Sequence, residues 1–299
     1  MRLLPYLCIS LFFFQSCHQQ NLGDENFYFH PDSSKTYSII LIKQETSSWQ
    51  YNKEETETTS EKISINLKLI RVVDSLYQLK LTFGDFRISR PPATITLNGI
   101  TKTYQLDSIP SKKGIKDNYF QLSYYWLGLT KGLSEYIWMN KKGEVLQVQG
   151  FDKLSDSVAV LSGSKKEDVK YSLTNNVGEK IISDNFNQLF SIAPNHKENI
   201  GDSWVRNIIL VDNAPVKLSD MYIINKIEGD SLFVHVTSSI SGWAGSNATT
   251  PFMEGQGDGE IIISKSTGVP YSYQLNSATK TKTDRYITTG SGKFSATVQ

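Results

Sequence analysis

The chain has few cysteines, and both lie near its start. Of its 299 residues only Cys8 and Cys17 carry a thiol, so the residues that follow Cys17 have none. Disulfides, thiolate metal sites and cysteine nucleophiles are therefore excluded from that part of the chain. Its stability must come from an ordinary hydrophobic core, which a chain of this length can bury.

The chain also lacks an excess of either charge. It contains 31 Lys and Arg against 30 Asp and Glu, a formal net charge of +1. Proteins that bind nucleic acid use an excess of cations to neutralise phosphates. No basic cluster here is longer than the pairs Lys141–Lys142 and Lys165–Lys166, so we expect no nucleic-acid partner.

Histidine is scarce and dispersed, which argues against metal chemistry. The four histidines are His18, His30, His196 and His235, and no His-x-His or His-Glu-x-x-His spacing occurs. A zinc enzyme of the familiar kind is therefore not expected. The acidic run 54–57 lacks the spacing of a calcium loop and is predicted to be a solvated face or turn. We expect no metal and no other cofactor.

Long apolar runs are absent after the N-terminus, where a transmembrane helix would need roughly 20 such residues. A shorter apolar run occupies 3–14, behind the single charge of Arg2, and is followed by Ser16 and Cys17. A short apolar stretch behind a basic residue is typical of a secretory signal. Because it ends at a cysteine, segment 1–16 resembles a bacterial lipoprotein signal of the kind common in Bacteroidetes.

That resemblance implies processing and attachment to a membrane. Cleavage between Ser16 and Cys17 would remove 1–16, and acyl chains such as palmitate on Cys17 would hold the protein in the membrane. We expect a lipid-anchored protein of the cell envelope, in the outer membrane, on its periplasmic or its surface face. The polar segment 17–33 is predicted to be a tether.

Alternation of apolar and polar residues dominates the rest of the chain. Segments 63–69 and 77–83 alternate in this way around a turn at 74–75. This period is typical of antiparallel strands that place one face on a core and the other in water. Asn98 and Gly99 suit the type I′ turn of a further hairpin, because both residues tolerate positive φ.

One more hairpin and two helices are predicted. Residues 140–143 should form a turn between two short strands. Segments 116–131 and 179–192 carry apolar residues near a 3.6-residue period, and Gly132 and Pro194 are suited to end them.

The order of these elements predicts a mainly β (α+β) fold: antiparallel curved sheets in two related halves, with a few packing helices. The β-rich halves would be 34–154 and 177–299, joined by the polar segment 155–176. Residues 74–77 and 230–233 share the pattern Asp-Ser-Leu-aromatic, which favours a duplication. Turns reuse Asp and Ser for backbone reasons, so chance remains an equally open explanation.

A short segment invites a catalytic interpretation. The sequence Gly201-Asp202-Ser203-Trp204 resembles the nucleophile block of one group of lipases and esterases. That chemistry needs a histidine base, commonly near the C-terminus, and no histidine follows His235. We predict a tight turn that enters a strand, with Trp204 packed, and no catalytic residue.

Three alternate glycines, Gly255, Gly257 and Gly259, are spaced like part of a dinucleotide-binding loop. Such a loop lies between a strand and a helix, whereas these glycines precede the apolar β run 261–263. We therefore predict a hairpin or a bulge.

Aromatic side chains are concentrated between residues 119 and 138. Two interpretations stay open: ordinary core and sheet material, or the lining of a groove for a sugar or a lipid. The candidate groove residues are Tyr119, Tyr125, Trp126 and Trp138.

Four Asp-Ser pairs that precede an apolar residue resemble the O-glycosylation acceptor of exported Bacteroidetes proteins. The same pairs are ordinary turn chemistry, and both interpretations stay open. The acceptor hydroxyls would be those of Ser75, Ser108, Ser157 and Ser231, which we expect in surface turns between strands.

Several turns and strand starts together resemble one uncharacterised family of Bacteroidetes lipoproteins, a domain of unknown function. They are 138–145, 201–204 after Pro194, and 257–259 before the β run 261–263. The resemblance supports export and architecture, and it implies no activity, ligand or catalytic residue.

The sequence therefore predicts a non-enzymatic cell-envelope lipoprotein that binds an apolar ligand or another envelope protein. Curved sheets with a helix over the concave face can shelter lipid, which is an analogy at the level of the fold. The alternative is a surface-exposed module that binds glycans or proteins within a larger assembly. A hydrolase is the least supported interpretation.

Overall fold

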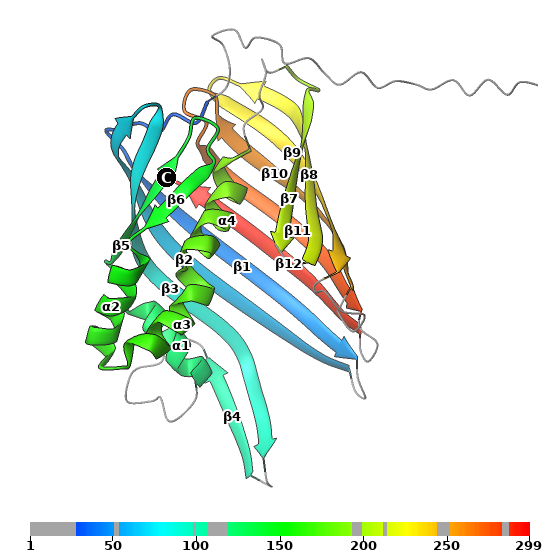
Figure 1. Ribbon diagram of the computed structural model, residues 1–299. Coiled ribbons are helices and arrows are strands. Elements are labelled where there is room, and N and C mark those ends of the chain that lie inside the picture. Colours follow the sequence, from blue (N-terminus) through cyan, green and yellow to red (C-terminus); the bar gives the residue numbers. More distant parts are fainter. Residues whose placement is uncertain are drawn as a thin grey trace, which may run out of the picture.

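The computed structural model describes residues 28–50, 54–97, 100–106, 119–192, 199–211, 214–243, 252–282 and 287–299. Within them lie twelve strands and four helices (Figure 1). The predicted fold class, mainly β and antiparallel with a few packing helices, is confirmed. The predicted signal peptide and Cys17 lie outside the described residues.

The strands of the first half are β1 (Thr36–Gln50), β2 (Glu54–Val73), β3 (Leu76–Leu97), β4 (Ile100–Leu106), β5 (Ser134–Met139) and β6 (Val145–Gln149). The helices are α1 (Tyr119–Gly128), α2 (Phe151–Ser162), α3 (Lys166–Val177) and α4 (Glu179–Phe190). The strands of the second half are β7 (Ser203–Val211), β8 (Ala214–Glu228), β9 (Ser231–Trp243), β10 (Phe252–Ser264), β11 (Pro270–Lys282) and β12 (Ile287–Val298).

All twelve strands belong to one sheet. Its order is β6-β5-β3-β2-β1-β12-β11-β10-β9-β8-β7, and β4 pairs only with β3. The first and last strands pair antiparallel, from Ile39 opposite Val298 to Gln50 opposite Ile287. The two predicted halves therefore share one continuous sheet, in which the chain's two ends meet at the centre.

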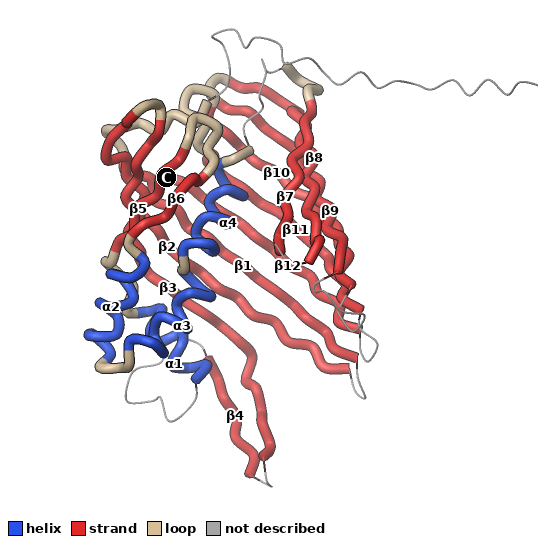
Figure 2. Tube along the Cα trace, viewed as in Figure 1, coloured by secondary structure: helices blue, strands red, loops and turns tan. Residues whose placement is uncertain are grey.

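The sheet is strongly curved, so that its two end strands, β6 and β7, come round to the same side of the molecule (Figures 1 and 2). Helix α4 lies between these end strands on the concave side, and the other helices gather beside β5 and β3. The curvature and α4 together define the interior in which the candidate site lies.

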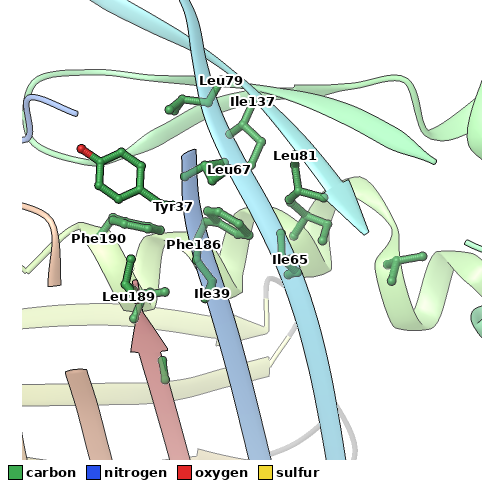
Figure 3. Packing of buried hydrophobic residues seen from close by; sticks show 14 of the residues in the cluster. Tyr37, Ile39, Ile65, Leu67, Leu79, Leu81, Ile137, Phe186, Leu189 and Phe190 are labelled. Atoms are coloured by element: carbon green, nitrogen blue, oxygen red, sulfur yellow. The ribbon is translucent and has the colours of Figure 1, made fainter. Parts of the chain in front are cut away.

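Part of the core lies between α4 and the concave face of the first half (Figure 3), and the same buried cluster continues into strands β8 to β12. Alternate residues of β1, β2, β3 and β5 point inward in register, for example Ile39 opposite Ile65 and Leu79 opposite Ile137. They meet Phe186 of α4. Burying each large apolar side chain stabilises the fold by roughly 1.5–3 kcal/mol. Because the alternation places these side chains on one face of the sheet, α4 packs on that face.

The predicted hairpin turns are confirmed where the structure describes them. Asp74 and Ser75 adopt φ values of 49° and 69°, the positive pair that a type I′ turn requires. Asn98 and Gly99 lie outside the described residues, but Leu97 and Ile100 pair on either side of them, which is the register that a two-residue turn gives.

The turn at 140–143 joins β5 to β6 as predicted. Its Gly143 has φ 76°, and a Cβ there would collide with the backbone carbonyl of Phe190 at the end of α4. Glycine is therefore required both by the conformation and by the contact with α4.

The two predicted helices form, as α1 within 116–131 and α4 within 179–192. The polar segment 155–176 contains most of two further helices, α2 and α3, which the sequence reasoning missed. Phe151, Leu154 and Val158 in α2 are buried at helical spacing, but intervening polar residues hide that period. Among the described residues no helix is long and apolar enough to cross a membrane.

The folded body begins inside the predicted tether 17–33. Phe29 is fully buried, and its ring contacts those of Tyr77 and Phe190 at centroid distances of 5.7 and 5.4 Å. Its backbone N–H donates to the carbonyl of Lys141 at 2.8 Å. The aromatic residues of this segment, Phe27, Tyr28 and Phe29, are consecutive and give no periodic signal, so the boundary could not be placed from the pattern.

Candidate functional site

A cavity lies where the two ends of the sheet face each other across α4. It has a volume of about 660 Å³, within the usual range of ligand pockets. Strand β6 forms one wall, α4 the next, and β7 with β8 the third. Its lining consists of Glu144, Val145, Leu146, Ile181, Asp184, Asn185, Asn187, Gln188, Ser191, Arg206, Asn207 and Leu218.

Helix α4 presents a different face to the cavity from the one it presents to the core. Ile182, Phe186, Leu189 and Phe190 are buried against the sheet. Residues one position away on the helix surface, Ile181 among them, turn toward the cavity. Because α4 is amphipathic, the side of the helix that lines the cavity carries mostly amide and carboxylate side chains.

Strand β6 is held against α4 by a side-chain contact. The backbone N–H of Val145 donates to Asn187 Oδ1 at 2.6 Å, which satisfies a donor at the free edge of this end strand. The carboxylate of Glu144 accepts a hydrogen bond from Asn140 Nδ2 at 2.6 Å. The cavity wall on this side is thus fixed by the turn that precedes β6.

The opposite wall rests on a buried ion pair. Arg206 Nη2 lies 2.7 Å from Asp220 Oδ2, and the Asp220 side chain is only 1% exposed. Asp220 also accepts hydrogen bonds from Tyr222 and Ser238, at 3.1 and 2.6 Å. Burial raises the pKa of the Tyr222 hydroxyl far above its ordinary value, so Tyr222 acts as a donor to Asp220 at any physiological pH.

The same arginine secures the end of α4. Arg206 Nη1 donates to the carbonyl oxygens of Asn187 and Ser191 at 2.9 and 3.0 Å. A cation at a helix C-terminus meets both the unpaired carbonyls and the negative end of the helix dipole. Arg206 therefore ties α4 to β7 and β8 through Nη1 and Nη2, and its charge is paired with Asp220, while its buried Nε–H has no partner among the described residues.

These contacts decide which chemistry suits the cavity. Arg206 is the one cation among its described lining residues, and Glu144 and Asp184 are its carboxylates. Apolar walls come from Val145, Leu146, Ile181 and Leu218, and amides supply neutral donors and acceptors. An anionic group would meet carboxylates with no uncommitted cation, whereas a neutral polar group would meet amides.

A smaller cavity lies on the other flank of α4. It has a volume of about 290 Å³ and lies between α3, α4 and strands β1, β2, β3 and β12. Ile181 and Asn185 line both cavities, so one turn of α4 separates them. Phe86, Leu127 and Phe294 give the smaller cavity an apolar floor.

Three of the four aromatic side chains predicted for a groove are described, and they have separate surroundings. Trp126 is 1% exposed and belongs to the core, with Nε1 donating to Ser164 at 3.2 Å. Tyr125 packs partly buried against that core. Trp138, on β5, lies under the guanidinium of Arg71 at 5.4 Å. The side chain of Tyr119 lies outside the described residues.

The predicted glycosylation serines occupy different settings. Ser75 is exposed in the β2–β3 turn, and Ser231 is half-buried at the start of β9. Ser157 was expected in a turn between strands, and this is wrong: it lies in α2, where its hydroxyl donates to the carbonyl of Lys153 at 2.8 Å. Ser108 lies outside the described residues.

The segment 201–204 forms the predicted turn into a strand. Gly201 has φ 92°, and β7 begins at Ser203. Trp204 stacks on Tyr222 with ring centroids 5.2 Å apart and donates to the carbonyl of Ile192 at 3.1 Å. Trp204 is thus a packing residue, as predicted.

The glycines of β10 are not in a hairpin or a bulge, so that prediction is wrong. Gly255, Gly257 and Gly259 lie in regular register inside the strand, between β9 and β11. A Cβ at Gly259 would collide with the backbone carbonyl of Gln274. Glycine allows the close approach of neighbouring strands here.

Metal ligands do not gather among the described residues, where no group of three or more His, Cys, Asp or Glu is placed to hold an ion. His30 Nδ1 forms a hydrogen bond with the Tyr77 hydroxyl at 3.0 Å, and His235 Nε2 lies 3.1 Å from Asp258. His18 and His196 lie outside the described residues.

A buried acid on β5 is a second feature that the sequence reasoning missed. Glu135 is fully buried, and both of its carboxyl oxygens lack a hydrogen-bond partner. Burial, helped by the charge of Glu179, raises the pKa of Glu135 to about 8, so it is protonated at neutral pH. It lies outside the lining of the larger cavity, beside Gly150, the residue that precedes α2.

Comparison with solved structures finds only distant likenesses. A structure of lipid–protein interactions in lipovitellin is 9% identical with a TM-score of 0.47; the match covers 88% of this chain and 25% of lipovitellin. This chain therefore spans about a quarter of that protein. The translocator domain of the autotransporter NalP from Neisseria meningitidis is 6% identical with a TM-score of 0.29, with 89% of both chains covered. Likenesses this weak carry no argument about function.

Comparison with curated protein sequences gives no match. The sequence profile of a family described as "Family of unknown function (DUF6263)" matches residues 74–270. The predicted resemblance to an uncharacterised family is thereby confirmed, while its lipoprotein and Bacteroidetes parts stay predictions. Because the matched segment is more than half of the chain, this protein belongs to that family of unknown function.

Proposed function

We propose that this protein is a lipid-anchored, non-enzymatic component of the cell envelope that holds a ligand with a large apolar part in the cavity beside α4. The observation that carries the proposal is the cavity of about 660 Å³ between β6, α4 and β7–β8. Its walls are fixed by the Val145–Asn187 and Arg206–Asp220 contacts, so the cavity is preformed. A preformed site avoids part of the ordering cost of binding.

The polar lining supports a neutral head group for this ligand. Asn187, Gln188 and Asn207 offer amide donors and acceptors, while Glu144 adds a carboxylate and Asp184 a second one that pairs with Lys180 at 3.1 Å. Burying an anion beside carboxylates without a free cation is unfavourable. A neutral amphipathic molecule such as a monoacylglycerol therefore suits the cavity better than a fatty-acid anion or a phospholipid phosphate.

The absence of an enzymatic role is part of the proposal. Ser203 is exposed at the first position of β7, on the side of the strand opposite Trp204 and Arg206, which are half-buried. Its position opposite Ile223 provides no base. Labelling of Ser203 by a fluorophosphonate, abolished in Ser203→Ala, would contradict this part of the proposal.

Attachment through Cys17 follows from the sequence and is tested separately. Cys17→Ser should leave the signal uncleaved or release the protein into a soluble fraction. Normal processing and unchanged membrane association of that variant would refute the anchor.

The ligand is tested by binding of a fluorescent monoacylglycerol, compared with the matching fatty-acid anion. Ile181→Trp fills the cavity from α4 and should weaken monoacylglycerol binding by about tenfold or more, a loss of about 1.4 kcal/mol. Val160→Trp is the matched control, because Val160 lies on α2 and is 77% exposed. Failure of the parent protein to bind the monoacylglycerol saturably would refute the proposal, as would equal losses in both variants.

A further inference from the structure

One end of the sheet gathers the segment through which the chain enters the fold. Four parts form this N-terminal rim: residues 28–35, the β2–β3 turn, the β5–β6 turn and the β10–β11 turn. The backbone N–H of Phe29 donates to the carbonyl of Lys141, and that of His30 donates to the carbonyl of Thr267 at 2.7 Å. With Phe29 buried, the rim is rigidly joined to the body.

The rim exposes large apolar side chains that a soluble surface would not need. Val72 and Val73, which end β2 beside its turn, are 53% and 40% exposed. Tyr28 and Tyr271 are 39% and 43% exposed. The Tyr271 hydroxyl donates to Asp230 at 3.1 Å. Aliphatic side chains next to tyrosines are typical of surfaces that lie at a membrane interface.

The rim carries charges of both signs, and its exposed lysines are the groups that can contact anionic lipid. Lys35, Lys141, Lys142 and Lys265 are exposed, and the ammonium of Lys141 lies 5.7 Å from the ring centre of Tyr28. Three of the acids at this end accept hydrogen bonds within it: Asp32 from Ser34, Glu144 from Asn140, and Asp230 from Ser264, Ser266 and Tyr271. Asp74 is exposed, as are Asp230 and Glu228, and Glu228 pairs with Lys226 at 2.6 Å.

From these observations we infer that the N-terminal rim rests on the lipid surface in which the protein is anchored. The inference rests on the proposed acylation of Cys17. The residues between Cys17 and Tyr28 can span at most about 40 Å, so the rim is the part of the described body that the anchor holds nearest the bilayer. Tethering raises the effective concentration of the rim at the surface, so four apolar side chains and a few lysines suffice for contact.

The rim also lies next to the candidate cavity. Gly143 in the β5–β6 turn touches the end of α4, and the adjacent Glu144 lines the cavity. Contact between rim and membrane would therefore bring the cavity close to the lipid from which an amphipathic ligand can enter.

The thiol-free body allows a direct test. Val73→Cys places a single thiol on the rim, and Leu161→Cys places one on α2, where Leu161 is 58% exposed. Each full-length variant is isolated in its processed form, labelled with a polarity-sensitive fluorophore, and reconstituted into vesicles of phosphatidylethanolamine and phosphatidylglycerol at 3:1. The label at 73 should shift to shorter wavelength and be quenched by nitroxide lipids, whereas the label at 161 should do neither.

Charge reversal gives an independent readout. Lys141→Glu with Lys142→Glu should reduce quenching at position 73 by at least half. The matched pair Lys165→Glu with Lys166→Glu, both exposed near α3, should leave it unchanged. Equal quenching at positions 73 and 161 overturns the inference, whatever the state of Cys17. The intact mass of the same samples shows whether Cys17 is acylated. The acylation of Cys17 and the contact of the rim with lipid are therefore tested independently.

Discussion

Glu135 gives the sharpest prediction, because a buried carboxyl without a partner must respond to pH. Its pKa rises from 4.5 to about 8 on folding, chiefly through burial and secondly through Glu179. The folded protein therefore holds this proton over a range in which the unfolded chain releases it. The sign follows: the stability is greatest below pH 4.5, falls as the pH rises, and becomes level above pH 8.

The magnitude follows from the size of the pKa change. Each pH unit between about 4.5 and 8 lowers the free energy of unfolding by about 1.4 kcal/mol, or roughly 5 kcal/mol in all. Glu135→Gln keeps the shape of the side chain and removes its titration. The free energy of unfolding of the variant minus that of the parent should rise by about 4 kcal/mol between pH 5 and pH 8. The corresponding difference in melting temperature should change on the order of 10 °C.

Urea unfolding of parent and variant at half-unit steps from pH 5 to 9 measures this difference. Glu260→Gln is the matched control, since Glu260 is exposed on β10, and its profile should follow that of the parent. Parallel profiles for the parent and Glu135→Gln would show that the carboxyl is hydrated or partnered, and the reasoning would be refuted.

Further predictions concern the parts that hold the fold and the rim together. Phe29→Ala should cost about 3–5 kcal/mol, measured by urea unfolding, because Phe29 is fully buried between two rings; a loss below 1 kcal/mol would mean that the segment does not dock. Asp220→Ala should cost about 3–5 kcal/mol, since it leaves Arg206 buried and unpaired, and an unchanged melting temperature would contradict the ion pair. Gly268→Val should prevent docking of the N-terminal segment, because φ is 66° and a Cβ would lie 2.7 Å from the carbonyl oxygen of Tyr28; proteolysis after residue 30 at the parent's rate would argue against it. If Ser75 is glycosylated, the intact mass of protein from its own host should exceed that of Ser75→Ala by more than the lost oxygen, and an equal sugar-free mass would dispose of the modification.

Local pattern was enough to predict most strands and two helices. Alternation in β2 and β3 identifies their inward faces, and Asp74 with Ser75 identifies the turn between them. These signals lie within a few residues of each other, so no knowledge of distant partners is required. The polar helices α2 and α3 were missed, because their buried positions are separated by lysines, serines and asparagines.

The candidate site was not predicted as a site, although signals of two buried acids, one beside the cavity and one apart from it, were present in the sequence. Asp220 is on the same, inward face of β8 as Tyr222 and Ile224. Glu135 is on the same face of β5 as Ile137 and Met139. An acidic residue on the apolar face of a strand is a reason to look for a buried partner or a shifted pKa. That Arg206 would meet α4 depends on how far the sheet curls, which no local pattern encodes.

The pairing of β1 with β12 has a consequence for how the chain reaches its folded state. Strand β1, which is synthesised before the other strands, finds one of its two neighbours only when β12 has been made. Contacts so distant along the chain form slowly, and an unpaired strand edge promotes aggregation meanwhile. We therefore expect the incomplete chain to depend on a holding chaperone. Circular permutation that links β12 directly to β1 should speed refolding, because it turns the most distant strand pair into a hairpin.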